Sequence, residues 1–194
     1  LLSTATFVLE EAKASGGDTI RVASGASMDD TSATSTFNVL EGLILAVDTK
    51  DRYTKRHSED VARYAMFLAS RLGLDADELR VIQTAGLLHD VGKIGIPDHI
   101  LRKPGKLTAA EFGIVKQHVA LGDMIVRDLP DLDQVRAGIR HHHERWDGNG
   151  YPDGLAGEEI PLGSRVIFIC DAYDAMRSDR PYRRAIGEAA ALEE

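Results

Sequence analysis

The sequence predicts an all-α fold, a bundle of helices that occupies residues 37–194. Two observations carry this prediction. From Phe37 onward, apolar residues recur every three or four positions, which is typical of helices with one buried face. No alternating apolar and polar pattern of useful length, which a half-buried strand would need, occurs in the same region. With 43% hydrophobic residues in 194, the chain can bury a substantial core.

The residues before this bundle have a different composition. Residues 1–22 read as the end of a helix followed by a short strand, with a glycine pair closing the helix. Residues 23–36 are rich in Ser, Gly, Ala, Thr and Asp, a composition typical of linkers. Because one helix and one strand cannot form a core, we interpret residues 1–22 as the remnant of a preceding domain and residues 23–36 as a linker.

Start and stop signals define the first helices of the bundle. An apolar helix is expected over residues 39–47, and a second from about His57 to Leu72, where a glycine follows. Asp75 and Glu78 form a capping box for the third helix, which we expect to end at Gly92.

Similar signals define the second half of the bundle. Thr108 and Glu111 form a capping box that opens a long helix, and Pro130 ends it. Another helix is expected over residues 132–143. A loop rich in Gly and Pro follows, in which glycines allow sharp turns, and a last helix is expected over residues 161–177.

Charge and composition exclude several classes of protein. A formal net charge of −8 argues against a binder of DNA or RNA polymers, which needs a basic surface. Cys170 is the only cysteine, so an intramolecular disulfide and a cysteine-based zinc site are excluded. No apolar stretch approaches the ~20 residues of a membrane span, and no secretory leader is visible. We therefore expect a cytoplasmic protein.

Histidines and aspartates lie on the core-facing sides of the expected helices. Side chains three or four positions apart share a helix face, and five apolar stripes each lead to a residue of a metal-binding type. A single histidine in such a place is more often a core residue that bonds to nearby backbone. The residues placed in this way are His57, His89, Asp90, His118, His142, His143 and Asp171.

Together these residues predict a metal site in the core of the bundle. Burying so many polar groups without partners would cost several kcal/mol each, whereas metal coordination satisfies them at once. Imidazole and carboxylate without thiolate suit iron, manganese, nickel, cobalt or zinc. An aspartate flanked by histidines can bridge two ions ~3.5–4 Å apart, an arrangement that activates water for phosphoryl displacement.

Three segments resemble the motifs of the HD-GYP family, a group within the HD superfamily of phosphohydrolases. Residues 89–98 resemble the HD signature, residues 142–152 the HHE and GYP segments, and residues 171–183 the closing motif. The resemblance covers the chain from about Val39 to its end. It implies an HD-superfamily helical bundle that hydrolyses cyclic di-GMP to linear pGpG, or on to GMP, by two-metal activation of water.

The resemblance also implies a role for each matching residue. Lys93 would meet the scissile phosphate and assist proton transfer, although a lysine at a helix end is also favoured by the helix dipole. Tyr151 would line the guanine or phosphate pocket, unless it is a plain loop aromatic. Arg180 and Arg183 would grip the second phosphate. One metal would take His57, His89 and Asp171, and the other His118, His142 and His143, with Asp90 as the catalytic bridge.

The number of metals follows from a departure from the family pattern. Some members carry a glutamate one turn before the first histidine ligand, and it joins a third metal. Tyr53 stands at that position here, so two divalent ions are expected, with iron or manganese favoured and nickel, cobalt or zinc also compatible. Two-metal members are expected to stop largely at pGpG. His99 and His141 are expected to be ordinary, partly exposed residues.

Partners and neighbouring domains are less defined. Residues 11–18 resemble the end of a GGDEF domain, and a chance helix end explains them nearly as well. An upstream GGDEF or sensory domain would then be part of the parent protein. The apolar helix at residues 39–47 would suit a homodimer interface, and a core position in the monomer explains it equally well.

Two other functions stay open. The first is an HD-superfamily hydrolase of another nucleotide, such as a linear nucleoside phosphate or 3',3'-cGAMP. The GYP segment and the Arg-Pro-Tyr-Arg run argue against the linear substrate, and neither separates cyclic di-GMP from 3',3'-cGAMP. The second is a catalytically silent module that binds nucleotides or proteins, and the complete set of predicted ligands argues against it.

Overall fold

The structure, a computed structural model, describes residues 28–50, 55–130, 132–178 and 184–194. All regular secondary structure in these ranges is helical, which confirms the predicted all-α class. Residues 39–194 form one compact unit, and residues 1–38 are assigned to another. The interpretation of residues 1–22 as a domain remnant lies outside the described residues.

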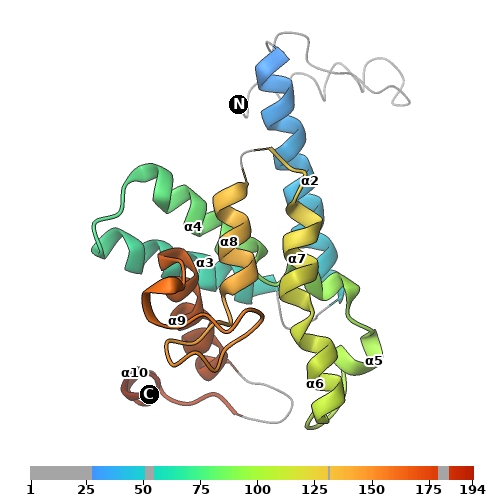
Figure 1. Ribbon diagram of the computed structural model, residues 1–194, viewed down its shortest axis with the longest axis vertical. Coiled ribbons are helices and arrows are strands. Elements are labelled where there is room, and N and C mark those ends of the chain that lie inside the picture. Colours follow the sequence, from blue (N-terminus) through green and yellow to red (C-terminus); the bar gives the residue numbers. More distant parts are fainter. Residues whose placement is uncertain (1–27, 51–54, 131, 179–183) are drawn as a thin grey trace, which may run out of the picture. The chain divides into compact units, whose positions relative to one another are not determined.

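The described elements agree largely with the predicted helices (Figure 1). In chain order they are α2 (Met28–Lys50), α3 (Lys55–Arg71), α4 (Ala76–Leu88), the 3-10 helix η1 (Val91–Gly95), α5 (Asp98–Leu101), α6 (Ala109–Lys116), α7 (His118–Val126), α8 (Asp133–His141), the 3-10 turn η2 (Gly157–Glu159), α9 (Leu162–Arg177) and α10 (Glu188–Glu193).

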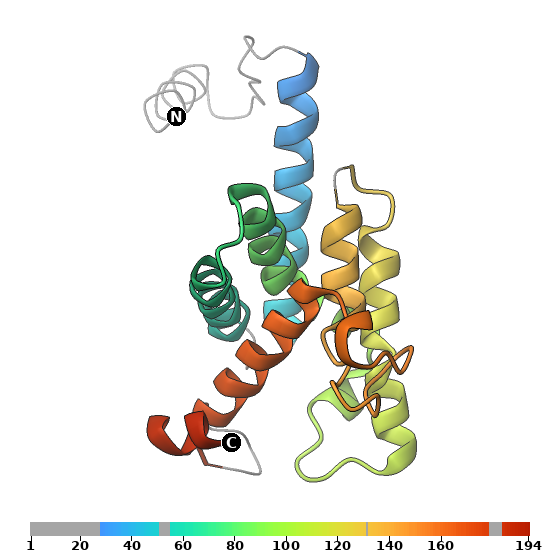
Figure 2. The same ribbon diagram turned by 60° about the vertical axis from the view of Figure 1, so that its left-hand side comes forward.

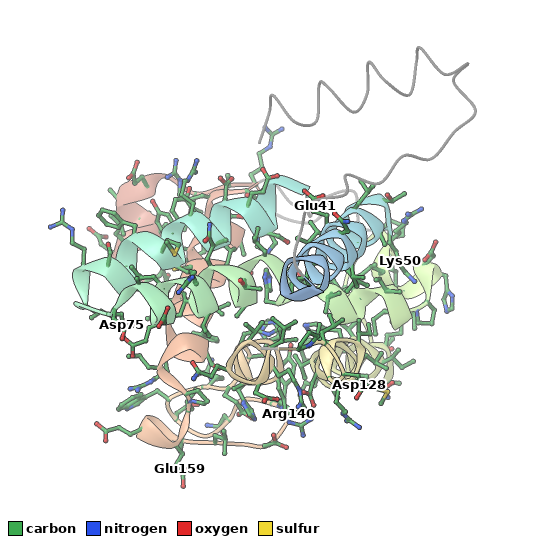
Figure 3. All side chains as sticks on the ribbon, turned by 90° about the horizontal axis from the view of Figure 1, so that it is seen from above. Glu41, Lys50, Asp75, Asp128, Arg140 and Glu159 are labelled. Carbon is green, nitrogen blue, oxygen red and sulfur yellow. The ribbon has the colours of Figure 1, made fainter. Side chains whose placement is uncertain are left out.

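Two helical hairpins and one crossing helix enclose the core. The α3–α4 hairpin turns at Gly73, whose φ of 80° is a left-handed value that favours glycine. The α7–α8 pair lies against it through α4, and α9 packs on α3, α4 and α8 (Figure 2). Seen from above, α7 and α8 lie side by side, and side chains fill the space between them and α4 (Figure 3). The core includes Val61, Ala65, Ile82, Val135, Ile139 and Ile167.

The predicted helix starts are confirmed in atomic detail. Asp75 caps α4 and Thr108 caps α6, and in each case a glutamate three residues later completes the capping box. These signals are read correctly from sequence because they involve only neighbouring residues.

Two predicted helices are shorter than expected. The third ends at Leu88 rather than Gly92, because η1 takes over at Val91. The long helix predicted to end at Pro130 is interrupted at Gln117, between α6 and α7. Both helices are shorter because η1 approaches α7 closely. A Cβ atom on Gly92 would lie 1.8 Å from the carbonyl oxygen of His118.

Helix α2 begins earlier than the composition suggests. It starts at Met28, so residues 28–36 of the segment interpreted as a linker are helical. Helix formation is cooperative, and an established apolar helix can propagate into a neighbouring segment of weak propensity. Val47 is buried in the core, whereas Leu45 is 60% exposed. Part of the apolar face thus belongs to the monomer core, and a homodimer stays a prediction.

No helix within the described ranges is both long and apolar enough to cross a membrane.

Candidate metal centre

The seven predicted metal ligands meet where α3, α4, α7, α8 and α9 converge. All except Asp171 lie at or near a helix end, and all are buried or half-buried. They come from the start of α3 (His57), the end of α4 (His89 and Asp90), the start of α7 (His118), the end of α8 (His142 and His143) and the middle of α9 (Asp171).

Main-chain carbonyls orient three of the imidazole rings. A carbonyl oxygen only accepts, so the bonded Nδ1 carries the proton and Nε2 keeps its lone pair for a ligand. In each case the carbonyl belongs to the residue three positions earlier. The Nδ1–H donates from His89 to Gly86 (2.7 Å), from His118 to Val115 (2.7 Å) and from His142 to Ile139 (2.8 Å).

The ligand atoms form two groups with Asp90 between them, and a third set, His89, Asp90 and His142, links the two groups. Within each group the ligand atoms lie within 4.8 Å of one another. One oxygen of Asp90 lies 3.4 Å from Nε2 of His89, and the other lies 3.5 Å from Nε2 of His118. This is the arrangement expected of a bridging carboxylate. We name the groups position A (His57, His89 and Asp171) and position B (His118, His142 and His143).

The imidazoles of position B are held neutral. Burial lowers the pKa of His118 and lowers that of His142 well below its usual value. Burial likewise lowers the pKa of His143 to about 4. Neutral imidazole is the form that binds a metal ion, so these side chains are ready to coordinate near neutral pH.

The carboxylates are held ionised. Burial alone would raise the pKa of Asp90, but the charge of Lys93 and the neighbouring His89 outweigh burial and leave that pKa well below its ordinary range. Burial opposes ionisation of Asp171 too, and the hydrogen bond from His57 outweighs it, so the net shift of its pKa is downward. Ionised carboxylates beside imidazoles are a donor set that fits divalent cations.

A buried nitrogen without a hydrogen-bond partner also supports metal binding by these residues. Nε2 of His89 is buried and has no hydrogen-bond partner among the described residues. A buried polar atom of this kind costs free energy unless something binds it, and a metal ion in position A would do so.

Two predicted substrate-contacting residues lie beside the cluster. Nζ of Lys93 is 2.6 Å from Oδ2 of Asp90, and its side chain is 16% exposed. The ring centroid of Tyr151 lies 4.8 Å from that of His143. The remaining predictions, for Arg180, Arg183 and Tyr53, fall outside the described residues.

His99 and His141 do not join the cluster, as predicted. His99 is exposed, and Nε2 of His141 lies 3.0 Å from a carboxylate oxygen of Asp153.

The loop that carries Tyr151 is anchored by a residue to which the sequence assigned no role. Glu144 is 2% exposed, and its Oε1 accepts hydrogen bonds from the main-chain N–H groups of Asp153 (2.7 Å) and Gly154 (3.0 Å). Gly148 and Gly154 turn the loop at φ values of 74° and 71°, as their positions predict. The anchor keeps Tyr151 against the cluster.

Two further side chains extend the surface around Tyr151. Nζ of Lys116 lies 4.9 Å from the ring centroid of Tyr151 and 5.0 Å from that of Phe112, which is 45% exposed. No pattern in the sequence indicates this pair, because α6 reaches the loop only in the folded molecule. The two rings can stack on a bound group and the Lys116 ammonium can donate hydrogen bonds to it, next to position B.

Asp174 is another residue of the site for which no role was predicted. It follows Asp171 by three positions on α9, so the two share a helix face. Oδ2 of Asp174 lies 2.6 Å from Nδ1 of His57. The helical spacing was the available signal.

Comparison with protein families gives one match over most of the chain. The family described as "HD domain" matches residues 43–194.

Two curated relatives show the same degree of similarity. The chain is 44% identical over 155 residues to the "Cyclic di-GMP phosphodiesterase response regulator RpfG" of Xanthomonas campestris pv. campestris, covering 79% of this chain and 41% of that protein. It is also 44% identical over 140 residues to the "3'3'-cGAMP-specific phosphodiesterase 2" of Vibrio cholerae, covering 71% of this chain and 27% of that protein. The chain thus spans less than half the length of either relative.

A solved structure has the same fold. The protein Bd1817 of Bdellovibrio bacteriovorus, described as an HDG"Y"P protein, superposes with a TM-score of 0.60 at 22% identity, over 73% of this chain and 46% of that chain. At this identity the likeness concerns the fold.

Proposed function

The chain belongs to the HD domain family, and we propose that it is a phosphodiesterase that hydrolyses cyclic di-GMP to linear pGpG. The family membership confirms the resemblance predicted from the motifs. The observation that carries the proposal is the position of Asp90, whose two oxygens face two separate groups of ligand-type side chains. A relative that is named a cyclic di-GMP phosphodiesterase supports the choice of substrate.

The proposed centre holds two divalent ions, with iron or manganese favoured. Position A and position B would each take one ion, and Asp90 would bridge them. When bound, such a pair supplies an activated water and charge stabilisation for an in-line phosphoryl displacement.

The protein's own residues would then complete the reaction. Lys93 Nζ, beside Asp90, can donate a hydrogen bond to the scissile phosphate and supply a proton to the departing 3'-oxygen. Breaking the P–O3' bond opens the ring and leaves the phosphate on the 5' side, which gives pGpG. Because Tyr53 replaces the carboxylate of a third site, we expect pGpG to accumulate rather than GMP.

The remaining contacts concern the nucleotide rather than the reacting atoms. Tyr151, with Phe112 and Lys116 beyond it, forms a surface on which a guanine can stack. Arg180 and Arg183 are proposed to bind the second phosphate, since guanidinium groups match phosphate oxygens.

Hydrolysis of 3',3'-cGAMP is the second candidate. The cGAMP-specific relative is as similar to the chain as the cyclic di-GMP relative is, at 44% identity. The two substrates share the phosphodiester ring and differ in one base, so the same centre would serve both.

The test is turnover by the purified protein, loaded anaerobically with Fe²⁺ or Mn²⁺ and given each cyclic dinucleotide separately. Separation of the products by chromatography should show cyclic di-GMP consumed faster, with pGpG accumulating. Faster consumption of 3',3'-cGAMP would select the second candidate. A metal-loaded protein that consumes neither would refute both candidates and leave a hydrolase of another nucleotide or a silent binding module.

A further inference from the structure

His57 has a different partner from the other oriented histidines. Its Nδ1–H donates to the carboxylate of Asp174 at 2.6 Å, whereas His89, His118 and His142 donate to main-chain carbonyls. The side chains of His57 and Asp174 are 5% and 7% exposed, so water screens this contact little. Ser178 Oγ also approaches the same Asp174 oxygen at 3.4 Å.

A carboxylate that accepts a hydrogen bond from a metal-binding histidine changes how that histidine binds the metal ion. It fixes the ring orientation and the tautomer, and it makes the opposite nitrogen a stronger donor. The opposite nitrogen of His57 faces position A, where its Nε2 lies 3.1 Å from Oδ1 of Asp171. The effect of Asp174 is therefore directed at position A.

The carboxylates around the two positions also favour metal binding at position A. Position A has its own carboxylate ligand in Asp171 and a second carboxylate, Asp174, directly behind it. Position B consists of three histidines, and no carboxylate belongs to it alone. The bridging Asp90 is common to both positions and does not distinguish them. A divalent cation therefore meets more negative charge in position A.

We propose that Asp174 is a positioning residue that makes position A the tighter metal site, so that the protein fills position A before position B. This inference rests on the two-ion centre of the proposed function. It adds that the two ions are held unequally, and it names the side chain outside the ligand set that is responsible. Losing such an outer partner typically costs about 10–100-fold in metal affinity.

The test is titration of the metal-free chain with Mn²⁺ under anaerobic conditions, with free Mn²⁺ followed by electron paramagnetic resonance. The wild type should bind one ion per chain tightly and a second more weakly. Asp174→Asn should weaken the tighter class by about 10–100-fold and leave the weaker class near its wild-type affinity. Asp174→Glu should restore part of the loss, and His143→Ala should remove the weaker class.

Asp123→Asn is the matched control. Asp123 is also a buried carboxylate, but it pairs with Arg136 at 2.8 Å and belongs to neither position. Circular dichroism should show a folded protein for each variant, and the control should keep both classes.

The inference fails if Asp174→Asn leaves the tighter class unchanged, or if the folded variant loses both classes equally. It also fails if wild-type protein binds two equivalent ions. Because titration does not involve turnover, ordered binding without hydrolysis of a cyclic dinucleotide would refute the proposed function alone. Hydrolysis by a protein with two equivalent ions would refute this inference alone.

Discussion

Asp90 is the residue on which the centre depends most. Its side chain is 5% exposed, and an ionised carboxylate in such a place requires compensating partners. Lys93 at 2.6 Å provides an opposite charge, and His89 and His118 approach from the two sides. Removing Asp90 would take away the carboxylate that Lys93 contacts and the side chain that lies between positions A and B.

Asp90→Ala should remove metal binding and lower the hydrolysis rate by roughly 10³-fold or more, the scale of losing a central catalytic group. Elemental analysis and turnover measure the two effects, and circular dichroism should show nearly unchanged helicity. Asp128→Ala is the control, since Asp128 is exposed and outside both positions. Retained hydrolysis by Asp90→Ala would refute the bridging role.

Metal binding at position A should depend on pH through His57. Burial alone would lower the pKa of His57, but hydrogen bonds to Asp171 and Asp174 outweigh it and raise the pKa to about 9 in the metal-free protein. Below that pH the ring carries a proton that a metal ion must displace. The affinity of position A should therefore rise as pH increases toward about 9 and level off above it.

Calorimetry in buffers of different ionisation enthalpy measures the protons released with the first ion. Near neutral pH, about one proton per chain is expected from His57. A first binding event with the same heat in every buffer would contradict the raised pKa.

At the scale of elements, helix ends position the ligands. The capping boxes and the end of α3 were predicted from sequence because their causes are local. The break at Gln117 and the 3-10 helix η1 were not predicted, because they result from contact between η1 and α7, which are distant in sequence. That same contact brings Asp90 to His118, so the departures from the predicted helices are part of the site.

Gly92→Ala should destabilise the fold and disturb the centre. The added Cβ would lie 1.8 Å from His118 O and 2.5 Å from Gly122 N, so backbone must move. Overpacking of this kind costs about 1–3 kcal/mol or more in unfolding free energy, measured by urea denaturation. Gly113→Ala is the control: nothing lies within 4 Å of its Cβ, and alanine favours helix α6. Equal stability of the two variants would contradict the close approach.

The contact between α6 and the Tyr151 loop can be tested through Lys116. Lys116→Met keeps most of the aliphatic stem and removes the charge that lies near the Phe112 and Tyr151 rings. If this surface binds the nucleobase, KM for the cyclic dinucleotide should rise about 2–5-fold, the scale of a cation–π contact, with kcat nearly unchanged. Steady-state kinetics measures the split, with the exposed Lys106→Met as control. An unchanged KM would argue that Lys116 only packs α6 onto the loop.

At the scale of the whole molecule, the seven side chains of the cluster could be predicted, but most of the residues that support them could not. All seven share an apolar stripe of their helix, and His89, Asp90, His142, His143 and Asp171 also lie in segments that resemble family motifs. Glu144, Phe112 and Lys116 act through contacts that only the tertiary structure creates. The homodimer, the upstream GGDEF or sensory domain and the cytoplasmic setting stay predictions.

The net charge of −8 also matters at this scale. Cyclic di-GMP is itself an anion, so the overall field of the protein would repel it. Local positive charge must offset this repulsion, and the two cations and Lys93 would provide it. Metal-free protein should therefore bind the substrate weakly.

Anomalous diffraction from crystals grown with Mn²⁺ tests the central claim most directly. The account predicts two peaks about 3.5–4 Å apart, one bound by His57, His89 and Asp171 and the other by His118, His142 and His143, with Asp90 touching both. No peak among these side chains, or a single peak that leaves one group unbound at saturating Mn²⁺, would contradict the two-metal centre.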